Sequence, residues 1–497
     1  MTGGSTGIQI LDSADLLPVM YNNLKEVTDV LQIPTSAAFI LLRNQRWNKE
    51  RLFELFYTGD DDEKKKLLES CGVFERVSRT SSSLINVKKC PTGNMSTCQI
   101  CFEDDIDVKD MYSMPCGHSF CRDCWVEYIE HMILSGPSDA IRTKCPQAGC
   151  QEIVTEDEMR DVLCGGSCSK NHSLIDKFRG YQLRCFVEQN GHTRWCPAPG
   201  CDKVAYTKTM CSSGDFSSGP VATCTCAHKF CLKCGEEPHA PAYCSVLTKW
   251  KDKCRNESET ANWILANTKA CPRCSSRIEK NQGCNHMSCQ SCKYEFCWIC
   301  MGDWNDHGTN TGGFYKCNRF NTSNDSNITD ADRAKRELDR YLHYYKRYHA
   351  HSEAQKFATK QLADTEAKMV LLQEASDTNT TWIDVQFLKT ATEQLVECRR
   401  VLKYTYVYAY FMHSPPDSNT STIGSKASII GSQEVTKMQM ECFENHQEML
   451  ERFTENLSEL SEKPMAEMNR KDVINQTRVV DRFMKNVLKY VEDGMDG

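Results

Sequence analysis

Apolar residues recur at helical spacing near the start of the chain and again across its last third. The first run breaks at Pro34, resumes, and is followed after Trp47 by a third short run, so three short helices are predicted over residues 12–57. A module of this kind either docks a partner or caps the neighbouring domain, and the pattern leaves both readings open. Its apolar face consists of Leu16, Met20, Leu24, Val27, Leu31, Ala37, Ile40, Leu41, Leu52, Leu55 and Phe56.

Long apolar periodicities also occupy residues 331–497 and predict an antiparallel helical bundle. The helices are expected over 331–372, 382–412, 434–462 and 465–495, with a Ser/Pro-rich loop at 414–432. The segment Tyr404–Tyr410 alternates like a strand, but its helical flank favours a buried helix. A coiled-coil partner site is the alternative, and the density of aromatic residues favours a packed interior.

Two connecting stretches lie between these helical regions and the cysteine-rich centre of the chain. Residues 60–97 combine a charge run with a serine-rich segment and are predicted to be a linker, in which a short helix at the start is allowed. Residues 151–195 are predicted to be mostly helical. The fold class is therefore multi-domain: helical ends around small cysteine-rich modules.

Composition narrows the chemistry. The 497 residues include 31 cysteines and carry a formal net charge of -7, which disfavours general nucleic-acid or anionic-membrane binding. The chain has no run of 18 apolar residues and no basic, apolar leader at its start, so we expect a cytoplasmic protein that also reaches the nucleus. In that reducing environment cysteines serve metal binding or catalysis rather than disulfides.

The first cysteine-rich block spans residues 98–150. It offers ligands for two zinc ions with none to spare, and so short a segment needs metal to fold, since a structural zinc contributes about 10–16 kcal/mol in small fingers. The spacing resembles a cross-braced RING domain, in which alternate ligand pairs share an ion. That resemblance assigns Cys98, Cys101, Cys121 and Cys124 to one zinc, and Cys116, His118, Cys145 and Cys150 to the other.

RING domains bind ubiquitin-conjugating enzymes in a shallow apolar groove. By resemblance, Ile100, Trp125 and Pro146 occupy the groove positions, although each has an alternative role in local packing. RINGs that activate direct transfer usually carry a basic residue after the last ligand, and this chain has Gln151 there. A downstream segment is therefore expected to take the ubiquitin.

The second cysteine-rich block, 196–244, again supplies two zinc sites and has no ligand left beside a base, so we interpret it as structural. Cys211 does not fit its pattern and is expected on a Gly/Ser-rich loop. Cys164, Cys168 and His172 form a three-residue set without a fourth ligand, which favours a plain loop over a metal site. The predicted ligands are Cys196, Cys201, Cys224, Cys226, Cys231, Cys234, His239 and Cys244.

The third block, 271–317, holds one candidate ligand too many. Two tetrahedral sites use eight ligands, and Cys284 is the ninth: it follows a glycine, belongs to no CxxC pair and precedes His286 by two residues. A thiol beside an imidazole has the composition of a cysteine nucleophile. Alternatively, Cys284 pairs with Cys289 and another cysteine is the spare. The predicted ligands are Cys271, Cys274, Cys289, Cys292, Cys297, Cys300, His307 and Cys317.

Three zinc blocks in this order resemble the RING-between-RING (RBR) ubiquitin ligases of the ariadne branch. The likeness covers residues from about 12 to the end. The chain departs from the family in two places: its Cys289–Cys292 knuckle is short, and it lacks the long acidic, glycine-rich opening segment. The likeness is carried by Trp195-Cys196-Pro197-Ala198-Pro199-Gly200-Cys201, Ser258-Glu259-Thr260-Ala261-Asn262-Trp263, Cys284-Asn285-His286-Met287 and Thr381-Trp382-Ile383-Asp384-Val385-Gln386-Phe387-Leu388-Lys389.

The resemblance implies a UBA-like module at 12–57, a first RING at 98–150, an in-between-RING (IBR) domain at 196–244, a catalytic second RING-like domain at 271–317 and an ariadne helical domain at 331–497. It implies six zinc ions and a thioester between ubiquitin and Cys284. His286 would deprotonate the incoming lysine, because an ammonium cannot attack until its proton leaves, and Glu295 would orient the histidine.

The same resemblance implies binding partners and autoinhibition. The partners are ubiquitin, a conjugating enzyme, protein substrates and, through the UBA-like module, a neddylated cullin–RING ligase. The ariadne domain is expected to hold the catalytic block shut through Phe357 and Glu455, and Ala358 replaces an acidic residue of the family's contact. A bundle that only binds substrate is the alternative.

Two other functions stay open at this point. A non-catalytic RING scaffold would dock a conjugating enzyme and would not need Cys284. A zinc-finger nucleic-acid binder is disfavoured by the net acidity and by the absence of basic finger helices.

Overall fold

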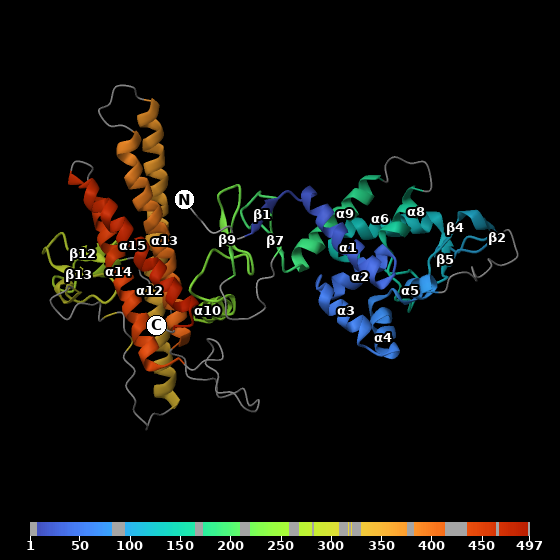
Figure 1. The fold of residues 1–497 in the computed structure, drawn as a ribbon, viewed down its shortest axis with the longest axis horizontal. Coiled ribbons are helices and arrows are strands. Elements are labelled where there is room, and N and C mark those ends of the chain that lie inside the picture. The colour runs from blue at the N-terminus through green and yellow to red at the C-terminus, as the bar shows by residue number, and fades with distance from the viewer. Residues whose placement is uncertain are drawn as a thin grey trace. The chain divides into compact units, whose positions relative to one another are not determined.

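The computed structural model describes residues 7–81, 95–164, 172–208, 219–257, 268–280, 283–307, 317, 320, 330–374, 382–412, 435–463 and 467–495. They belong to two compact units, labelled by element in Figure 1, and each is described by itself. The first comprises residues 1–211 and 220–235, and the second comprises 212–219 and 236–497. No described helix is long and apolar enough to cross a membrane.

The first unit begins with the predicted three-helix module. A 3-10 turn, η1 (Ala14–Leu16), leads into α1 (Leu17–Leu31), α2 (Thr35–Asn44) and α3 (Lys49–Tyr57). Pro34 caps α2 in an extended conformation, and the Asn48 side chain accepts from the Arg51 N–H to start α3. Trp47 packs edge-on against Phe39 of α2 and against Phe186, with ring centroids 5.6 and 4.6 Å apart. The module is thereby joined to the core of this unit.

The short helix allowed at the start of the predicted linker, residues 60–97, is present, but the linker prediction is wrong for the second helix that follows it. The two helices are α4 (Asp61–Cys71) and α5 (Phe74–Ser81), separated by Gly72 in a left-handed conformation that ends α4. The charge run lies on the solvent side of α4, while Leu68 and Val77 are buried. Residues 82–94 lie outside the described part.

Arg76 attaches α5 to the rest of the unit through buried ion pairs. Its guanidinium, 8% exposed, bonds Glu158 at 2.5 Å and lies 3.6 Å from Glu152. A buried cation needs such partners because desolvation otherwise costs several kcal/mol.

The cysteine-rich block that follows is built on short hairpins and two helices. Strand β2 (Met95–Ser96) pairs with β3 (Ile106–Asp107), and, after η2 (Val108–Asp110), β4 (Met111–Ser113) pairs with β5 (Ser119–Cys121). The two helices are α6 (Arg122–Ser135) and α7 (Pro137–Ile141), and after the block come α8 (Glu156–Cys164) and α9 (His172–Gln189). Trp125 of α6 is 1% exposed and forms the centre of this block.

A strand that the sequence pattern did not reveal ties the N-terminus to the second cysteine-rich block. Strand β1 (Ile8–Leu11) pairs antiparallel with β7 (Val204–Thr207), which also pairs with β6 (Thr193–Trp195), giving the order β1-β7-β6. Lys203 and Asp12 form an ion pair beside this sheet. A separate hairpin joins β8 (Val221–Thr223) and β9 (Lys229–Cys231).

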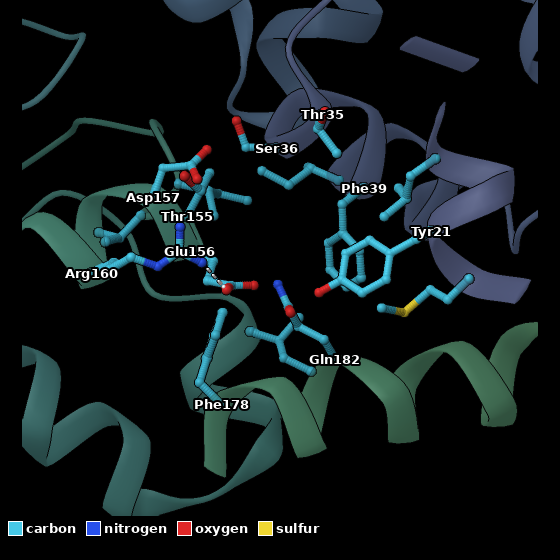
Figure 2. A pocket seen from close by; sticks show the side chains of 16 residues that line it. Tyr21, Thr35, Ser36, Phe39, Thr155, Glu156, Asp157, Arg160, Phe178 and Gln182 are labelled. Atoms are coloured by element: carbon cyan, nitrogen blue, oxygen red, sulfur yellow. Dashed lines mark hydrogen bonds and ion pairs between the residues drawn. The ribbon is translucent and has the colours of Figure 1, made fainter. Parts of the chain in front are cut away.

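The first unit also contains a cavity of about 140 Å³, between α1 and α2 on one side and α8 and α9 on the other. Figure 2 shows Tyr21, Glu156 and Gln182 around it, with Phe39 on the α2 side and Phe178 on the α9 side. Glu156 is paired there with Arg160 at 2.5 Å and Arg179 at 2.8 Å, so its charge is satisfied within the unit.

The second unit joins α10 (Cys244–Asn256) and a small zinc-ligand block to the long helices. The block has two hairpins, β10 (Thr268–Ala270) with β11 (Arg277–Glu279) and β12 (His286–Ser288) with β13 (Glu295–Cys297), followed by η4 (Trp304–His307). The helices are α12 (Asp330–Glu374), α13 (Trp382–Met412), α14 (Lys437–Glu462) and α15 (Arg470–Glu492). In Figure 1, α12 and α13 run side by side, with α14 and α15 against them.

The predicted bundle is confirmed. Tyr404–Tyr410 lies within α13, and these residues are buried. Trp250 of α10 sits among aromatic rings of the bundle, with centroid distances of 5.7 Å to Tyr341, 5.5 Å to Tyr348 and 5.3 Å to Tyr410. Glu237 adds a polar anchor: it is paired with Lys403 and accepts a 2.7 Å bond from the Tyr404 hydroxyl.

Candidate zinc sites and active site

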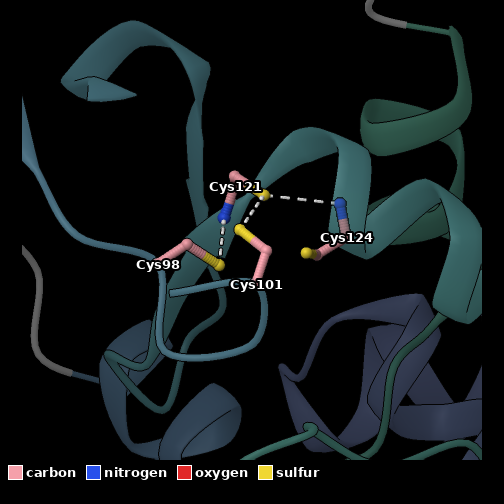
Figure 3. Close-up of side chains that lie close together, drawn as sticks. All are labelled: Cys98, Cys101, Cys121 and Cys124. Atoms are coloured by element: carbon pink, nitrogen blue, oxygen red, sulfur yellow. Dashed lines mark hydrogen bonds between the residues drawn. The ribbon is translucent and has the colours of Figure 1, made fainter. Parts of the chain in front are cut away.

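Three groups of cysteine and histidine side chains in the first unit converge as zinc sites would. In each group the ligand atoms lie within 4.8 Å of one another, which suits four donors around one ion. Figure 3 shows the first, where loop cysteines meet two from the start of α6. The groups are Cys98, Cys101, Cys121 and Cys124; Cys116, His118, Cys145 and Cys150; and Cys196, Cys201, Cys224 and Cys226.

Their pairing is the cross-braced one that the RING resemblance implies. Cys101 and Cys121 sulfurs lie 3.9 Å apart although 20 residues separate them in the chain, and His118 Nδ1 lies 3.2 Å from Cys116 Sγ and 3.7 Å from Cys145 Sγ. None of these cysteines forms a disulfide. Thiolates and imidazole at such distances fit zinc, which would hold together blocks that have little apolar core of their own.

The remaining predicted ligands of the second block are divided by the boundary between the units. Cys231 and Cys234 belong to the first unit, and His239 and Cys244 belong to the second, where Cys244 Sγ lies 3.5 Å from His239 Nε2. His239 Nδ1 is 2.7 Å from the Ala242 carbonyl, an orientation in which Nε2 is left for a metal.

The second unit contains two further ligand sets. Cys271, Cys274, Cys289 and Cys292 form one group, with 3.7 Å between the Cys271 and Cys292 sulfurs and 3.6 Å between those of Cys274 and Cys289. In the other, Cys300 Sγ lies 3.2 Å from His307 Nε2, and the Cys297 and Cys317 thiols also hydrogen-bond Cys300. Cys164 and His172 lie at the facing ends of α8 and α9, whereas Cys168 and Cys211 lie outside the described residues.

Cys284 stands outside the first of these sets although Cys289 belongs to it. The alternative pairing of Cys284 with Cys289 is therefore not the arrangement seen. Cys284 lies on the loop before β12, is 6% exposed, and its sulfur accepts the His286 backbone N–H at 3.3 Å. A cleft of about 720 Å³ is lined by Cys284 and His286 and also by Glu459 and Glu462 of α14 and by Lys463, the residue that follows α14.

His286 and Glu295 are brought together by the β12–β13 hairpin. Glu295 pairs with Ser288, two positions along β12 from His286, so both side chains lie on the same face of the hairpin, and His286 Nε2 is 3.6 Å from Glu295 Oε2. The imidazole also stacks on Trp304, with centroids 4.3 Å apart and planes within 8°. Sequence reasoning missed Trp304. Its place three residues before the ligand His307, on the same 3-10 turn, was the available signal.

Glu455 of α14 contacts the loop that carries Cys284. One carboxylate oxygen accepts the Asn285 backbone N–H at 2.8 Å, and the other accepts the Asn285 side-chain amide at 2.9 Å and Arg399 at 2.6 Å. Burial opposes ionisation of Glu455, but the adjacent Arg399 charge prevails and lowers the Glu455 pKa to about 2. Burial, followed by the Glu455 charge, raises the pKa of the Cys284 thiol well above its ordinary value.

Phe357 of α12 covers the residue before the cysteine. A Cβ at Gly283 would lie 3.3 Å from the Phe357 ring and 3.5 Å from Ser458 and Glu462, so glycine permits this close approach. Ala358, the position where the resemblance implies an acidic residue, is 4% exposed within the bundle core.

The groove residues of the first block differ in exposure. Ile100 is 41% exposed, and Pro146 is half-buried. The expectation that Trp125 lines the groove is wrong: it is 1% exposed, its indole donates to the Tyr112 carbonyl at 3.1 Å, and it therefore supports the surface from below. Phe102, at 79% exposure, is the apolar group beside Ile100 that sequence reasoning missed.

Family models match five successive stretches of the chain. A RING finger of the C3HC4 type matches residues 98–147, and an IBR domain model matches both 176–244 and, in a second form, 266–313. The ariadne domain model matches 339–497, and a UBA-like domain model named after the E3 ubiquitin-protein ligase ARIH1 matches 19–58.

Whole-chain comparison agrees. The chain is 34% identical to the E3 ubiquitin-protein ligase dbl4 of Schizosaccharomyces pombe, over 93% of this chain and 81% of that protein. It is 34% identical to ariadne-1 of Drosophila melanogaster, over 98% and 89%, and 33% identical to human ARIH1, over 98% and 80%. With this domain order and these zinc-ligand sets, the chain belongs to the ariadne-type RING-between-RING E3 ubiquitin-protein ligases.

Proposed function

We propose that this ligase accepts ubiquitin onto Cys284 as a thioester and then transfers it to a substrate lysine. The observation that carries the proposal is the position of Cys284: it stands outside the ligand set of its neighbours, beside a histidine that has its own carboxylate. A thiol, a base and an orienting acid are the parts of a covalent transfer site.

The first step exchanges one thioester for another. Cys284 loses its proton, its sulfur attacks the ubiquitin carbonyl carbon, and the bond to the conjugating enzyme's sulfur breaks, leaving a thiolate that takes up a proton. In the second step the lysine amine displaces Cys284 after losing its own proton, and His286 is placed to accept it. Zinc, proposed as six ions, would hold the framework rigid.

Autoinhibition is the second part of the proposal. The Glu455 contact with Asn285 and the Phe357 contact with Gly283 leave Cys284 only 6% exposed, too little for a bulky thioester to reach. The bundle is tethered to the same unit, so even weak contacts act at roughly millimolar effective concentration. Opening of α14 from the loop would be the activating change.

The activating partner is proposed to be a neddylated cullin–RING ligase bound by the UBA-like module. Support comes from the apolar groups that this module leaves exposed: Tyr57 at 65%, Val30 and Tyr21 at 43%, and Leu55 at 39%. Tyr57 and Val30 are neighbours, since the Tyr57 hydroxyl donates to the Val30 carbonyl at 3.0 Å. The names of the relatives mention no cullin–RING ligase and no substrate, so experiments must identify both the partner and the substrates.

The thioester is tested with a conjugating enzyme charged with ubiquitin. We expect the parent protein to form a thiol-sensitive adduct and Cys284→Ser to form a thiol-resistant, base-labile ester instead. Cys284→Ala should form neither. Ubiquitin chains built by Cys284→Ala at the parent rate would contradict the proposal and favour a non-catalytic RING scaffold.

A further inference from the structure

Lys280 is a charged group beside the transfer site that the steps above do not use. It follows β11, is partly buried, and its Nζ donates to the Asn285 side-chain oxygen at 2.8 Å. Asn285 is 1% exposed, and its backbone N–H and side-chain amide are both taken by Glu455. The residue next to Cys284 is thus held by a cation from its own block and by an anion from α14.

The charges facing Cys284 come from three elements. The bundle supplies the Arg399 cation from α13 and the Glu455 and Glu462 carboxylates from α14, with Glu459 along the same cleft. The zinc-ligand block that contains Cys284 supplies Lys280 and His286. Arg399 and Glu455 are bonded to each other at 2.6 Å, so they belong to the bundle as a neutral pair.

Separation of the bundle from the Cys284 loop therefore changes which charged groups surround the cysteine, without any chemical modification. When α13 and α14 leave the loop, Arg399 and Glu455 leave together, whereas Lys280 stays in the zinc block. Burial is the largest cause that lowers the Lys280 pKa to about 8, and exposure on opening relieves it, so the ammonium remains protonated at neutral pH. In the open state the Glu455 carboxylate is therefore gone from the surroundings of Cys284, and the Lys280 ammonium remains.

We propose that Lys280 is a positioning and charge-supplying residue of the transfer site: its ammonium holds the Asn285 amide and, in the open state, stabilises the Cys284 thiolate. The inference deepens the proposed function and rests on it. Release of α14 then activates Cys284 in two ways: the sulfur becomes reachable, and the Glu455 carboxylate, whose charge raises the Cys284 pKa, departs while Lys280 stays.

The test uses the full-length chain opened by Phe357→Ala and Glu455→Ala. Into it are placed three matched substitutions: Lys280→Arg keeps the charge and the hydrogen-bond donor, Lys280→Gln keeps a donor without charge, and Lys280→Met keeps neither. The rate at which iodoacetamide alkylates Cys284 is followed by peptide mass spectrometry across a pH series, a readout that needs no ubiquitin.

We expect the alkylation midpoint to rise by about one pH unit in both neutral variants and to stay near the parent value in Lys280→Arg. Ubiquitin loading at neutral pH should slow about tenfold in Lys280→Gln and recover as the pH is raised. Zinc content is measured for each variant, and if Lys280→Met does not retain zinc, the Gln and Arg pair alone decides. An unchanged midpoint in zinc-replete Lys280→Gln overturns the proposal. The separate Cys284→Ala experiment reports on the transfer function itself.

Discussion

At the scale of single residues, His286 separates the two chemical steps. Loading exchanges one thioester for another and needs no base for an amine, whereas discharge requires a lysine to lose its proton. We expect His286→Ala to load ubiquitin at near the parent rate and to discharge it to lysine at least tenfold more slowly, with partial recovery as the pH is raised. Single-turnover discharge of a purified adduct measures this. Loss of loading together with loss of zinc would make His286 structural instead.

Arg399 offers a second prediction, because it is the cation paired with buried Glu455. Arg399→Met leaves that carboxylate unpaired, and breaking a buried pair costs about 3–5 kcal/mol, so the bundle should unfold at lower denaturant concentration. Urea unfolding of matched parent and variant samples checks it.

The pH dependence of that cost has a definite sign. In the parent the Glu455 pKa is lowered from 4.5 to about 2, so its contribution is present above 4.5 and is lost only as the pH falls towards 2. In the variant, burial without the Arg399 cation raises this pKa relative to the parent, and the carboxyl takes up a proton in milder acid. The difference between parent and variant should therefore shrink from neutral to mildly acidic pH, and a constant difference would argue against Glu455 as the affected group.

At the scale of elements, α10 is fastened to the bundle through Trp250, which is 1% exposed among tyrosines of α12 and α13. Trp250→Ala should destabilise the second unit by about 3–5 kcal/mol. Calorimetry or urea unfolding would register it. Truncation before α12 would expose the same ring, so point variants on α12 and α14 test autoinhibition more cleanly than deletion of the bundle.

The elements also show which structure the sequence could predict. Zinc-ligand spacing gave the small modules and the surplus of Cys284, because metal geometry is local and strict. The helical spacing of apolar residues correctly predicted that α13 continues through Tyr404–Tyr410, because the long helical pattern before this segment is stronger evidence than its short strand-like alternation. It failed for α5, where charged and polar neighbours concealed buried Val77. It also failed for β1, whose partner β7 is far away in the sequence: Ile8 pairs with Thr207, 199 residues later.

Site residues followed the same division. Cys284 and His286 were identified by composition, but Trp304 and Lys280 were not, because stacking and hydrogen bonding to the loop exist only after folding. Trp125 was placed on the groove by resemblance and lies beneath it. Motifs identify ligands, whereas exposure depends on tertiary packing.

At the scale of the whole molecule, activation is proposed to begin at the UBA-like module. Tyr57→Ala combined with Val30→Ala removes the exposed pair without touching buried Leu52. We expect binding to a neddylated cullin–RING ligase to weaken about tenfold or more, measured by titration with the purified complex, since an exposed aromatic anchor carries much of an interface's energy. Met438→Ala, an exposed position on α14, is the matched control. Equal affinity of parent and double variant would remove this surface from the docking proposal.

The central claim is that α12 and α14 keep Cys284 from receiving ubiquitin, and its most direct measurement is the initial rate of thiol-sensitive adduct formation on the full-length chain. Phe357→Ala with Glu455→Ala should raise that rate at least tenfold without any partner, because the Gly283 and Asn285 contacts are then lost. Met438→Ala with Glu441→Ala, two exposed positions on α14, should leave the rate unchanged. A zinc-replete Phe357→Ala, Glu455→Ala protein that loads ubiquitin no faster than the parent would contradict the account.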